Sequence, residues 1–270
     1  MALKKVLIAV KTYPTLSAKY DELVCTAGFL EDGSWIRIYP IPFRKKPYNQ
    51  QYKKYDWIEV DLEKNISDFR PESFRPISLD TKINVVGHIG TENNWEERKK
   101  ICLRKIYYNL TELIAEAKNK NICTSLAVFK PTEILDFYAE PDESDWDNHK
   151  LDKLNQLNLF ESEKEGKFEV VKKLPYKFKF RFKDRQGTES RMMIEDWETG
   201  QLYWNCLNRR KGDEKKAIAD VRKKYFDDFA KTKDLYFFLG TTQAFHFQSR
   251  NPFIIIGTFH PKIEIHGKLF

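Results

Sequence analysis

The stretch that indicates the fold class most clearly is KFKFRFK, residues 177–183. Phenylalanine and a cation alternate strictly along it, and successive side chains of a β-strand point to opposite faces. We therefore predict a strand with Phe178, Phe180 and Phe182 in a core and four cations on the other face. Asp184-Arg185-Gln186-Gly187 favours a turn, so residues 188–194 can return as a partner strand.

Two helices and two more strands are predicted between this hairpin and the C-terminus. Residues 196–210 carry apolar side chains at helical spacing, and a second helix starts after Gly212-Asp213. Residues 235–241 and 253–259 are strongly apolar and β-prone, with the loop 242–252 between them. Helices inserted between hairpins are typical of an α+β module.

The first half is richer in strands. Residues 6–10 form a short apolar run, and residues 22–30 and 34–41 flank the turn Glu31-Asp32-Gly33 as a hairpin. Residues 55–63 alternate again, residues 95–118 show one helical periodicity, and residues 126–138 are extended except at Pro131. A strand-rich half with one helix before its last strand is compatible with an OB-like barrel.

A charged segment divides the two halves. We predict an α+β, β-rich chain in which each module is a small barrel-like or open antiparallel sheet with inserted helices. Residues 1–139 are the predicted N-terminal OB-like module with one long helix, residues 140–167 a charged linker, and residues 168–270 a C-terminal α+β module.

Composition favours a polyanionic partner. The 270 residues carry a formal charge of +7 with a pI near 9.0, and they include 20 Phe, 13 Tyr and 6 Trp that can fill cores or stack on bases. The four cysteines show no Cys-x-x-Cys spacing, which argues against a zinc ribbon. For the leading hypothesis we expect neither a bound metal nor a cofactor. We find neither a signal-peptide pattern nor an apolar run of about 20 residues, which predicts a cytoplasmic protein without membrane contact.

Three groups of side chains are candidates for nucleic-acid binding. The first, which we name the cationic stripe, consists of Lys177, Lys179, Arg181 and Lys183; its side chains are spaced by about 6.6–6.8 Å, near the phosphate spacing of an extended strand. The second is Arg209, Arg210 and Lys211, and the third is the set of possible stacking rings Trp35, Tyr39 and Phe247. A solvated strand face, an edge guarded by lysine and a salt-bridged helix surface explain the cations equally well.

Catalytic candidates are few. Glu195 and Asp196 open a predicted helix. His246 lies in the loop of a predicted hairpin and His260 just after its second strand, so these four could share a metal or acid–base site if hairpin and helix pack together. Helix capping and structural histidines account for the same residues without chemistry. A metal-dependent nuclease or nucleotide-processing enzyme is therefore the alternative function.

The linker contains QLNLF at residues 156–160, which resembles the pentapeptide with which bacterial replication and repair proteins dock on the sliding clamp. The resemblance implies polar contacts for Gln156 and apolar pockets for Leu157, Leu159 and Phe160; Asn158 departs from the usual Ser or Asp. Leu151, Leu154, Leu157 and Phe160 also recur every three residues and could pin a linker helix to its own domain. A third function, protein-interaction adaptor, would rest on this peptide alone.

The strings VCTAG at 24–28, WIRIYPI at 35–41 and DLYFF at 234–238 resemble an uncharacterised group of bacterial proteins with a dual OB-containing domain. That resemblance implies two barrel-like modules with a nucleic-acid role and no established catalytic residues. The leading hypothesis is a non-enzymatic nucleic-acid-binding protein of bacterial DNA maintenance or phage defence. We expect DNA rather than RNA as its partner and the sliding clamp as its recruiter.

Overall fold

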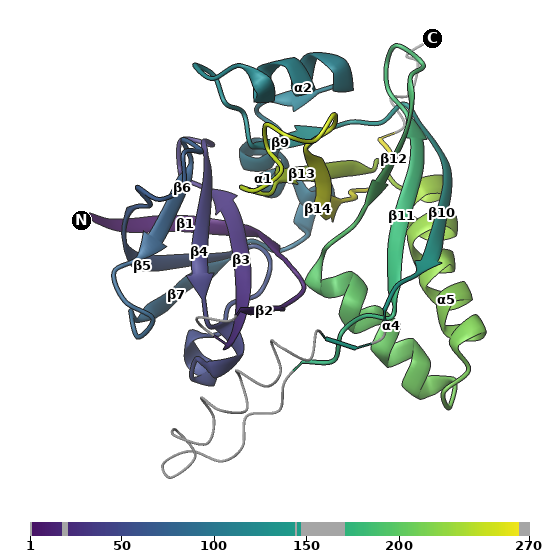
Figure 1. The fold of residues 1–270 in the computed structure, drawn as a ribbon, viewed down its shortest axis with the longest axis horizontal. Helices are drawn as coiled ribbons and strands as arrows, with labels where there is room; N and C mark the ends of the chain where they lie inside the picture. Colours follow the sequence, from purple (N-terminus) through teal and green to yellow (C-terminus); the bar gives the residue numbers. More distant parts are fainter. Residues whose placement is uncertain (1, 18–20, 144, 147–170, 265–270) are drawn as a thin grey trace.

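The computed structural model describes residues 2–17, 21–143, 145–146 and 171–264 (Figure 1). The predicted fold class is confirmed: the chain is a β-rich α+β protein in which two modules lie side by side. The clamp-type peptide of Gln156, Leu157, Leu159 and Phe160 lies outside the described residues, as does most of the predicted linker.

A closed five-stranded barrel forms the first module. Its strands are β1 (Ala2–Lys11), β3 (Asp21–Phe29), β4 (Trp35–Ile41), β5 (Asp56–Lys64) and β6 (Ser73–Pro76). They pair in the order β1-β3-β4-β6-β5 and back to β1, with β4 and β6 parallel. Numbered along the chain the order is 1-2-3-5-4, as in an OB-type barrel. β2 (Thr15–Ser17) extends β3, and β7 (Ile83–His88) extends β5.

The barrel interior follows the predicted alternation. Ile58, Val60 and Leu62 point inward and are buried, as are Ile36 and Ile38 on β4. β-Branched side chains suit this position because they pack well on a pleated surface. Between β4 and β5 the chain makes two short 3₁₀ turns, η1 (Phe43–Lys45) and η2 (Tyr48–Gln50).

The prediction of one helix over residues 95–118 was wrong. The chain instead forms α1 (Glu92–Cys102), a short strand β8 (Ile106–Tyr107) and α2 (Leu110–Lys118). β8 pairs with β9, which removes its residues from the helical ladder. The side chain of Asn109 then accepts the backbone N–H groups of Thr111 and Glu112, so it starts α2 as an N-cap.

The second module repeats the strand order of the first. Its strands are β9 (Leu126–Phe129), β10 (Glu133–Pro141), β11 (Tyr176–Lys183), β12 (Glu189–Met193), β13 (Tyr236–Thr241) and β14 (Phe253–Phe259). β9 and β10 follow each other closely along the chain. β10 pairs with β11 and β9 pairs with β13, so the two together take the place of the first strand of a barrel, with a bend between them. A parallel bridge from Ile194 to Ile255 connects the end of β12 to β14. The path is again 1-2-3-5-4 and back to 1.

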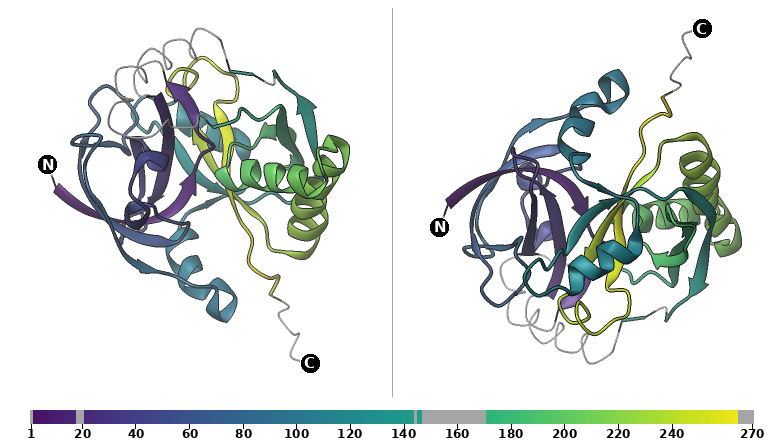
Figure 2. Two further views of the ribbon diagram at one scale, coloured as in Figure 1. Left: turned by 90° about the horizontal axis from the view of Figure 1, so that it is seen from below. Right: turned by 90° about the horizontal axis from the view of Figure 1, so that it is seen from above.

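Helices of the second module lie between its third and fourth strands, where the first module has η1 and η2. They are α4 (Trp197–Arg209), α5 (Glu214–Arg222) and the π-helical segment η3 (Lys223–Ala230). Helix α5 lies on the side remote from the first barrel (Figures 1 and 2). Phe180, Phe182 and Tyr203 are fully buried in the core beneath these helices, so the predicted inward face of β11 is confirmed.

The change from one module to the next lies upstream of the predicted boundary at residue 140. β9 and β10 pair with strands of the second half, and Phe129 and Phe137 share a core with Phe178. The strands change sheet between β7 and β8. The apolar pattern of residues 126–138 shows that they form strands, but it does not show which strands they pair with.

An apolar interface joins the modules. Ala27, Phe29 and Trp35, on the outer face of β3 and β4, pack against a second-module surface that includes Val128 and Phe238. The buried Arg37 guanidinium crosses the interface: it donates to Ser125 Oγ at 2.7 Å and to the carbonyls of Ser125 and Thr241. The outer face of strands 2 and 3 in the first barrel is therefore covered by the second module.

Candidate functional site

A cavity of about 470 Å³ lies between the modules, and both contribute to its walls; we name it the inter-module cleft. The first module supplies Lys11, Lys53, Lys54, Tyr55, His88, Trp95 and Arg98, and the second supplies Trp197, Glu198, Phe229, Thr258 and His260. Its size lies within the range of about 300–1,000 Å³ typical of small-ligand pockets, which often form between domains.

Strained backbone shapes one wall of the cleft. Tyr55 has a φ of 67°, and three successive residues, Asn93, Asn94 and Trp95, have φ of 47°, 55° and 65°. L-residues other than Gly adopt this left-handed region rarely, at a cost of order 1–3 kcal/mol each when held there. Tyr55 and Trp95 both line the cleft, with ring centroids 5.9 Å apart. Strain of this kind accumulates at ligand sites, where surrounding structure holds it.

Cations lie on aromatic faces within the cleft. The guanidinium carbon of Arg98 is 3.7 Å from the Tyr55 ring centroid and 4.8 Å from that of Trp95. The Nζ of Lys11 is 3.8 Å from the Phe43 centroid and 4.6 Å from that of Trp197. Contacts of this kind hold a cation without neutralising its charge.

A buried ion-pair network fixes helix α4 against the first barrel. Lys54 Nζ lies 2.8 Å from Asp196 Oδ2 and 2.8 Å from Glu198 Oε2, and the Lys54 side chain is only 7% exposed. Asp196 also caps α4 by accepting the backbone N–H of Glu198. Burial raises the pKa of Asp196 to about 6 although Lys54 opposes the shift. Burial also disfavours charged Lys54, but the two carboxylates outweigh it and raise its pKa. The network therefore connects the two modules beside the cleft.

Three other cations of the cleft are not paired with carboxylates. The ion pairs formed among the described residues include Lys54 but not Lys11, Lys53 or Arg98. Lys11 reaches only the carbonyl of Tyr52, at 3.4 Å, and Arg98 donates twice to the carbonyl of Ile89. Burial lowers the pKa of Lys11 to about 8. Buried charge without a partner is costly, so this arrangement favours an anionic ligand.

Two histidines line the same cleft in different states. His260 stacks on Phe229 at 3.7 Å, and burial lowers its pKa to about 4, so the ring is neutral at pH 7. His88 is half exposed and its Nδ1 lies 2.7 Å from Asp56 Oδ1. Asp56 is itself held by the backbone N–H of Lys53 at 2.7 Å. The pairing orients His88 so that Nε2 is the nitrogen left for a ligand.

The four predicted catalytic residues do not come together. His260 lines the cleft, and Asp196 lies behind its wall, paired with Lys54. His246 is completely buried elsewhere, hydrogen-bonded to Thr241 Oγ1 and to the carbonyl of Ala117. Glu195 lies outside the cleft lining, and burial raises its pKa. Within residues 2–17, 21–143, 145–146 and 171–264, no group of three or more metal-ligating side chains forms. The predicted metal cluster is therefore not present in this part of the chain.

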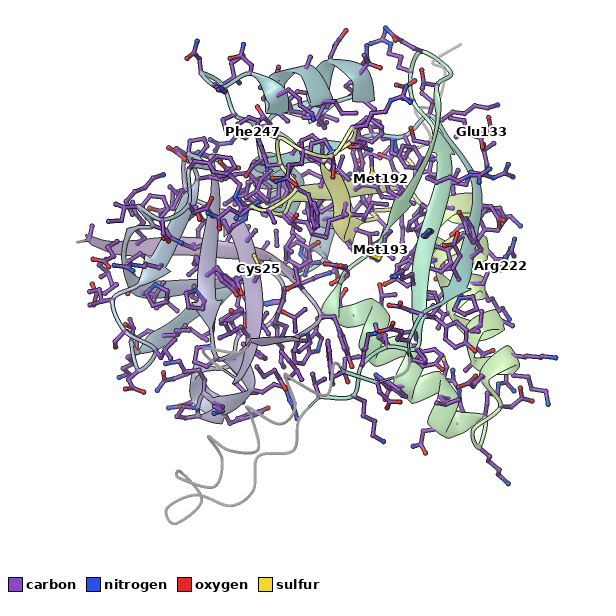
Figure 3. All side chains as sticks on the ribbon, in the orientation of Figure 1. Cys25, Glu133, Met192, Met193, Arg222 and Phe247 are labelled. Atoms are coloured by element: carbon purple, nitrogen blue, oxygen red, sulfur yellow. The ribbon has the colours of Figure 1, made fainter. Side chains whose placement is uncertain are left out.

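The cationic stripe lies on β11, on the open outer face of the second barrel. Every one of its cations meets a carboxylate: Lys177 pairs with Asp142 at 2.9 Å, Lys179 with Glu140, Arg181 with Glu189 at 3.5 Å and Lys183 with Glu133 at 3.0 Å. Figure 3 shows Glu133 near the upper end of β10. A phosphate would have to compete with these carboxylates, and binding by the stripe remains a prediction.

The other predicted nucleic-acid contacts are also distributed over separate surfaces. Arg210 forms two hydrogen bonds with Asp220, Arg209 pairs with the same carboxylate at 3.6 Å, and Lys211 is exposed. Trp35 lies in the interface between the modules, 4.0 Å from the Phe29 ring centroid, and Tyr39 is 37% exposed.

Phe247, like Tyr39, is a predicted stacking residue that is exposed. It is 39% exposed and stacks on Phe69 at 5.0 Å, beside Phe245, which is 56% exposed. Figure 3 places Phe247 on the loop between β13 and β14. This loop meets the β5–β6 loop of the first barrel, because Gln243 donates to the carbonyl of Ser67 at 2.6 Å.

Sequence reasoning missed most of the cleft, including Lys11, Lys53, His88 and Arg98. These residues are far apart along the chain and share no spacing that marks a site. One signal was present: the expectation that the hairpin would pack against the start of the 196–210 helix brings His260 near Asp196. The first-barrel wall had no such signal because its residues come from the end of β1, the turn before β5, the end of β7 and helix α1.

Two family models match the chain. One, described as domain of unknown function DUF8758, matches residues 2–104, and the other, domain of unknown function DUF8757, matches residues 107–270. The junction of the two matches coincides with the change of sheet between β7 and β8. No curated protein matches the chain.

Among solved structures, the chain is similar to a murine DNA-binding protein bound with double-stranded DNA. The identity is 10%, the match covers 98% of each chain, and the TM-score is 0.32, which is too low to support a functional argument. Among the described residues, no helix is long and apolar enough to cross a membrane.

Proposed function

The chain belongs to the family described as domain of unknown function DUF8757, and from the geometry of the inter-module cleft we propose that it binds nucleic acid. The observation that carries the proposal is the set of three cations without carboxylate partners, Lys11, Lys53 and Arg98, in a cavity walled by aromatic rings. Nucleic acid supplies the two missing partners, a phosphate for the cations and a base with a π-face for the rings.

The strand order of the barrels supports the same proposal. OB-type barrels bind oligonucleotides on the face of strands 2 and 3 and on the adjoining loops. In the first barrel that face is covered, and in the second it carries the ion-paired cationic stripe. The cleft, in contrast, gathers three cations that form no ion pair among the described residues, beside aromatic rings. The net charge of +7 adds a long-range attraction for a polyanion.

Fluorescence anisotropy tests the proposal with labelled single-stranded DNA, duplex DNA and RNA at about 50 mM and about 200 mM salt. We expect binding, most strongly to DNA, that weakens about tenfold or more at the higher salt as counterions are released. Replacement of Lys53 by Glu, together with Lys11 by Gln, is expected to weaken binding roughly tenfold. The absence of binding to all three polymers at low salt would overturn the proposal.

A matched variant on the second barrel locates the interaction. Lys179→Glu with Arg181→Glu removes two cations of the stripe, so it reduces the net charge by at least as much as the cleft variant. We expect it to weaken binding only a few-fold, because these side chains already pair with Glu140 and Glu189. A larger loss from the stripe variant than from the cleft variant would place the polymer on the open face.

The cellular setting is a separate proposal. We propose a cytoplasmic bacterial protein of DNA maintenance or phage defence that the sliding clamp recruits through Gln156, Leu157, Leu159 and Phe160. The support is the resemblance of this peptide to clamp-docking peptides. A pull-down with purified clamp, comparing the native chain with Leu159→Ala plus Phe160→Ala, tests it. Equal recovery of clamp by both chains would contradict recruitment by this peptide.

The Asp56–His88 pair favours a second candidate function, metal-independent processing of a nucleotide. A carboxylate on Nδ1 fixes the tautomer and leaves Nε2 to exchange a proton with a bound substrate. Incubation of end-labelled RNA and DNA in the presence of EDTA tests it. Cleavage that is lost in His88→Ala would support this function, and intact substrate after prolonged incubation would exclude it for these polymers.

A further inference from the structure

We infer that the inter-module cleft recognises a single nucleotide unit carrying a phosphate monoester, such as the phosphorylated end of a nucleic-acid strand. This inference rests on the proposed function and names the ligand of the same site. A cavity of about 470 Å³ is the size of a small-molecule pocket, whereas an oligonucleotide needs a groove that follows its backbone. One nucleotide is therefore the part of the polymer that the cleft can enclose.

The charge of the cleft favours a monoester over the diester of a continuous strand. A terminal phosphate carries about −1.5 to −2 charges at pH 7, as a phosphorylated side chain does, and a backbone diester carries only one. Lys11, Lys53 and Arg98 all line the cavity; Arg98 is buried, Lys11 is half-buried and Lys53 is exposed. A dianion can pair with more than one of these cations. The free-energy penalty of holding the cations in a partly buried site is therefore reduced more by a monoester than by a diester.

The remaining walls suit a base. Trp95 and Trp197 are half-buried and come from opposite modules, so their rings border the cavity from two sides. His260 is held against Phe229, and Trp95 lies 5.0 Å from it. The Nδ1 of His260 lies 3.5 Å from Thr258 Oγ1, which leaves Nε2 of the neutral ring to form one hydrogen bond with the edge of a nucleobase. The ring of Trp95 is held in the absence of a ligand by its contacts with Phe259, at 5.1 Å between centroids, and with Arg98.

The test compares three single-stranded DNA oligonucleotides of one sequence, with a 5′-phosphate, with a 3′-phosphate and with hydroxyls at both ends. Binding is followed by anisotropy and by the tryptophan fluorescence of the cleft. We expect one phosphorylated oligonucleotide to bind at least tenfold more tightly than the unphosphorylated one, and the preferred end identifies the polarity. The matching nucleoside monophosphate should compete, and the nucleoside should not.

Two variants and a pH series complete the test. The Lys53 side chain is exposed and forms no ion pair with the residues that the structure describes. In Lys53→Gln the preference for a phosphorylated end should fall several-fold, whereas Lys179→Gln on the stripe should leave it unchanged. Affinity for the phosphorylated end should decline above about pH 8, where Lys11 loses its proton, and Lys11→Arg should abolish that decline. The charged groups that face Lys11 are Asp56, Lys54, Asp196 and Glu198. The pKa of Asp196 is about 6 and that of Glu198 is lowered, so both carboxylates are ionised above pH 8, and Lys54, whose pKa the two carboxylates raise, stays charged.

The outcomes separate this inference from the proposed function. Equal affinity for phosphorylated and unphosphorylated ends, without competition by the nucleoside monophosphate, would overturn the inference and leave nucleic-acid binding standing. If the chain binds the nucleoside monophosphate directly but binds no polymer, the proposed function is overturned and the cleft is a pocket for free nucleotides. Binding of neither would overturn both.

Discussion

The two barrels share one strand order but use the equivalent outer face in opposite ways. On strands 2 and 3 of the first barrel, Ala27, Phe29 and Trp35 pack against the second module. On the same strands of the second barrel, Lys179 and Arg181 alternate with buried phenylalanines and stay partly exposed. The comparison shows that side chains, and not topology, decide whether such a face joins modules or meets solvent.

Covering the first face also creates the inter-module cleft. When the barrels dock, the end of β1 and the turn before β5 come to lie beside the start of α4 and the end of β14. Lys54 then reaches Asp196 and Glu198 across the junction. The apolar interface and the proposed ligand site are thus consequences of one packing arrangement. Substitutions on the covered face, on the open face and in the cleft test this arrangement separately.

The largest expected effect is on the covered face. Phe238 is completely buried, with its ring 5.5 Å from Trp35, so Phe238→Ala should lower the free energy of unfolding by about 3–5 kcal/mol. Arg191→Ala on the open face is the control and should change it by no more than about 0.5 kcal/mol. Urea unfolding measures both. If the two variants lost similar amounts of unfolding free energy, the face of the first barrel would not be covered as the structure describes.

A somewhat smaller effect is expected for the polar contact inside the same interface. Arg37→Ala removes hydrogen bonds to Ser125 and Thr241 and leaves their oxygens without this donor, at a cost of about 3 kcal/mol. The comparison is Arg181→Ala, whose surface ion pair with Glu189 contributes about 1 kcal/mol or less. Equal melting behaviour of the two variants would contradict a structural role for Arg37.

The smallest effect concerns pH and the buried His260. The pKa of His260 falls from 6.5 to about 4 on folding. Between these pH values the imidazole is protonated in the unfolded chain but not in the folded chain. The free energy of unfolding therefore decreases as the pH falls from 6.5 to 4. Asp196 acts in the opposite direction, because its raised pKa lets the folded chain bind a proton first. Comparing urea unfolding of the native chain and His260→Gln isolates the histidine.

Between pH 6.5 and pH 4 the native chain should lose more unfolding free energy than His260→Gln, by on the order of 1 kcal/mol. A difference that stays constant across the window would show that His260 is as accessible to protons when folded as when unfolded. Asp196 remains in both chains, so its contribution cancels in the difference.

Local patterns were sufficient to predict most of the strands. The alternation of residues 177–183 and 55–63 correctly gave both the strands and their buried faces. Trp35, Arg37 and Tyr39 stand at alternate positions of the predicted strand 34–41 and so share one face, but this spacing could not show that another module covers much of that face. A polar residue opposite an apolar face usually meets water, whereas Arg37 meets the carbonyl groups of a neighbouring sheet.

The prediction of the long helix and of the cleft failed for one shared reason. Periodicity reports which side of an element is apolar, whereas β8 forms because β9 offers it hydrogen bonds from elsewhere in the chain. In the same way, Lys11, Arg98 and His260 meet only through the docking of two modules. Only the proximity of His260 to Asp196 was foreseen, because it requires a single contact, between the C-terminal hairpin and the start of the 196–210 helix.

Photocrosslinking tests the central claim most directly, that docking covers the first barrel and leaves the inter-module cleft as the binding site. An oligonucleotide substituted with iododeoxyuridine next to its preferred phosphorylated end is irradiated with the chain, and the linked peptides are identified by mass spectrometry. The account predicts crosslinks at Trp95, Trp197 or Phe229, lost when excess nucleoside monophosphate is present. Crosslinks confined to Tyr138 and Met193 on the open face of the second barrel would contradict it.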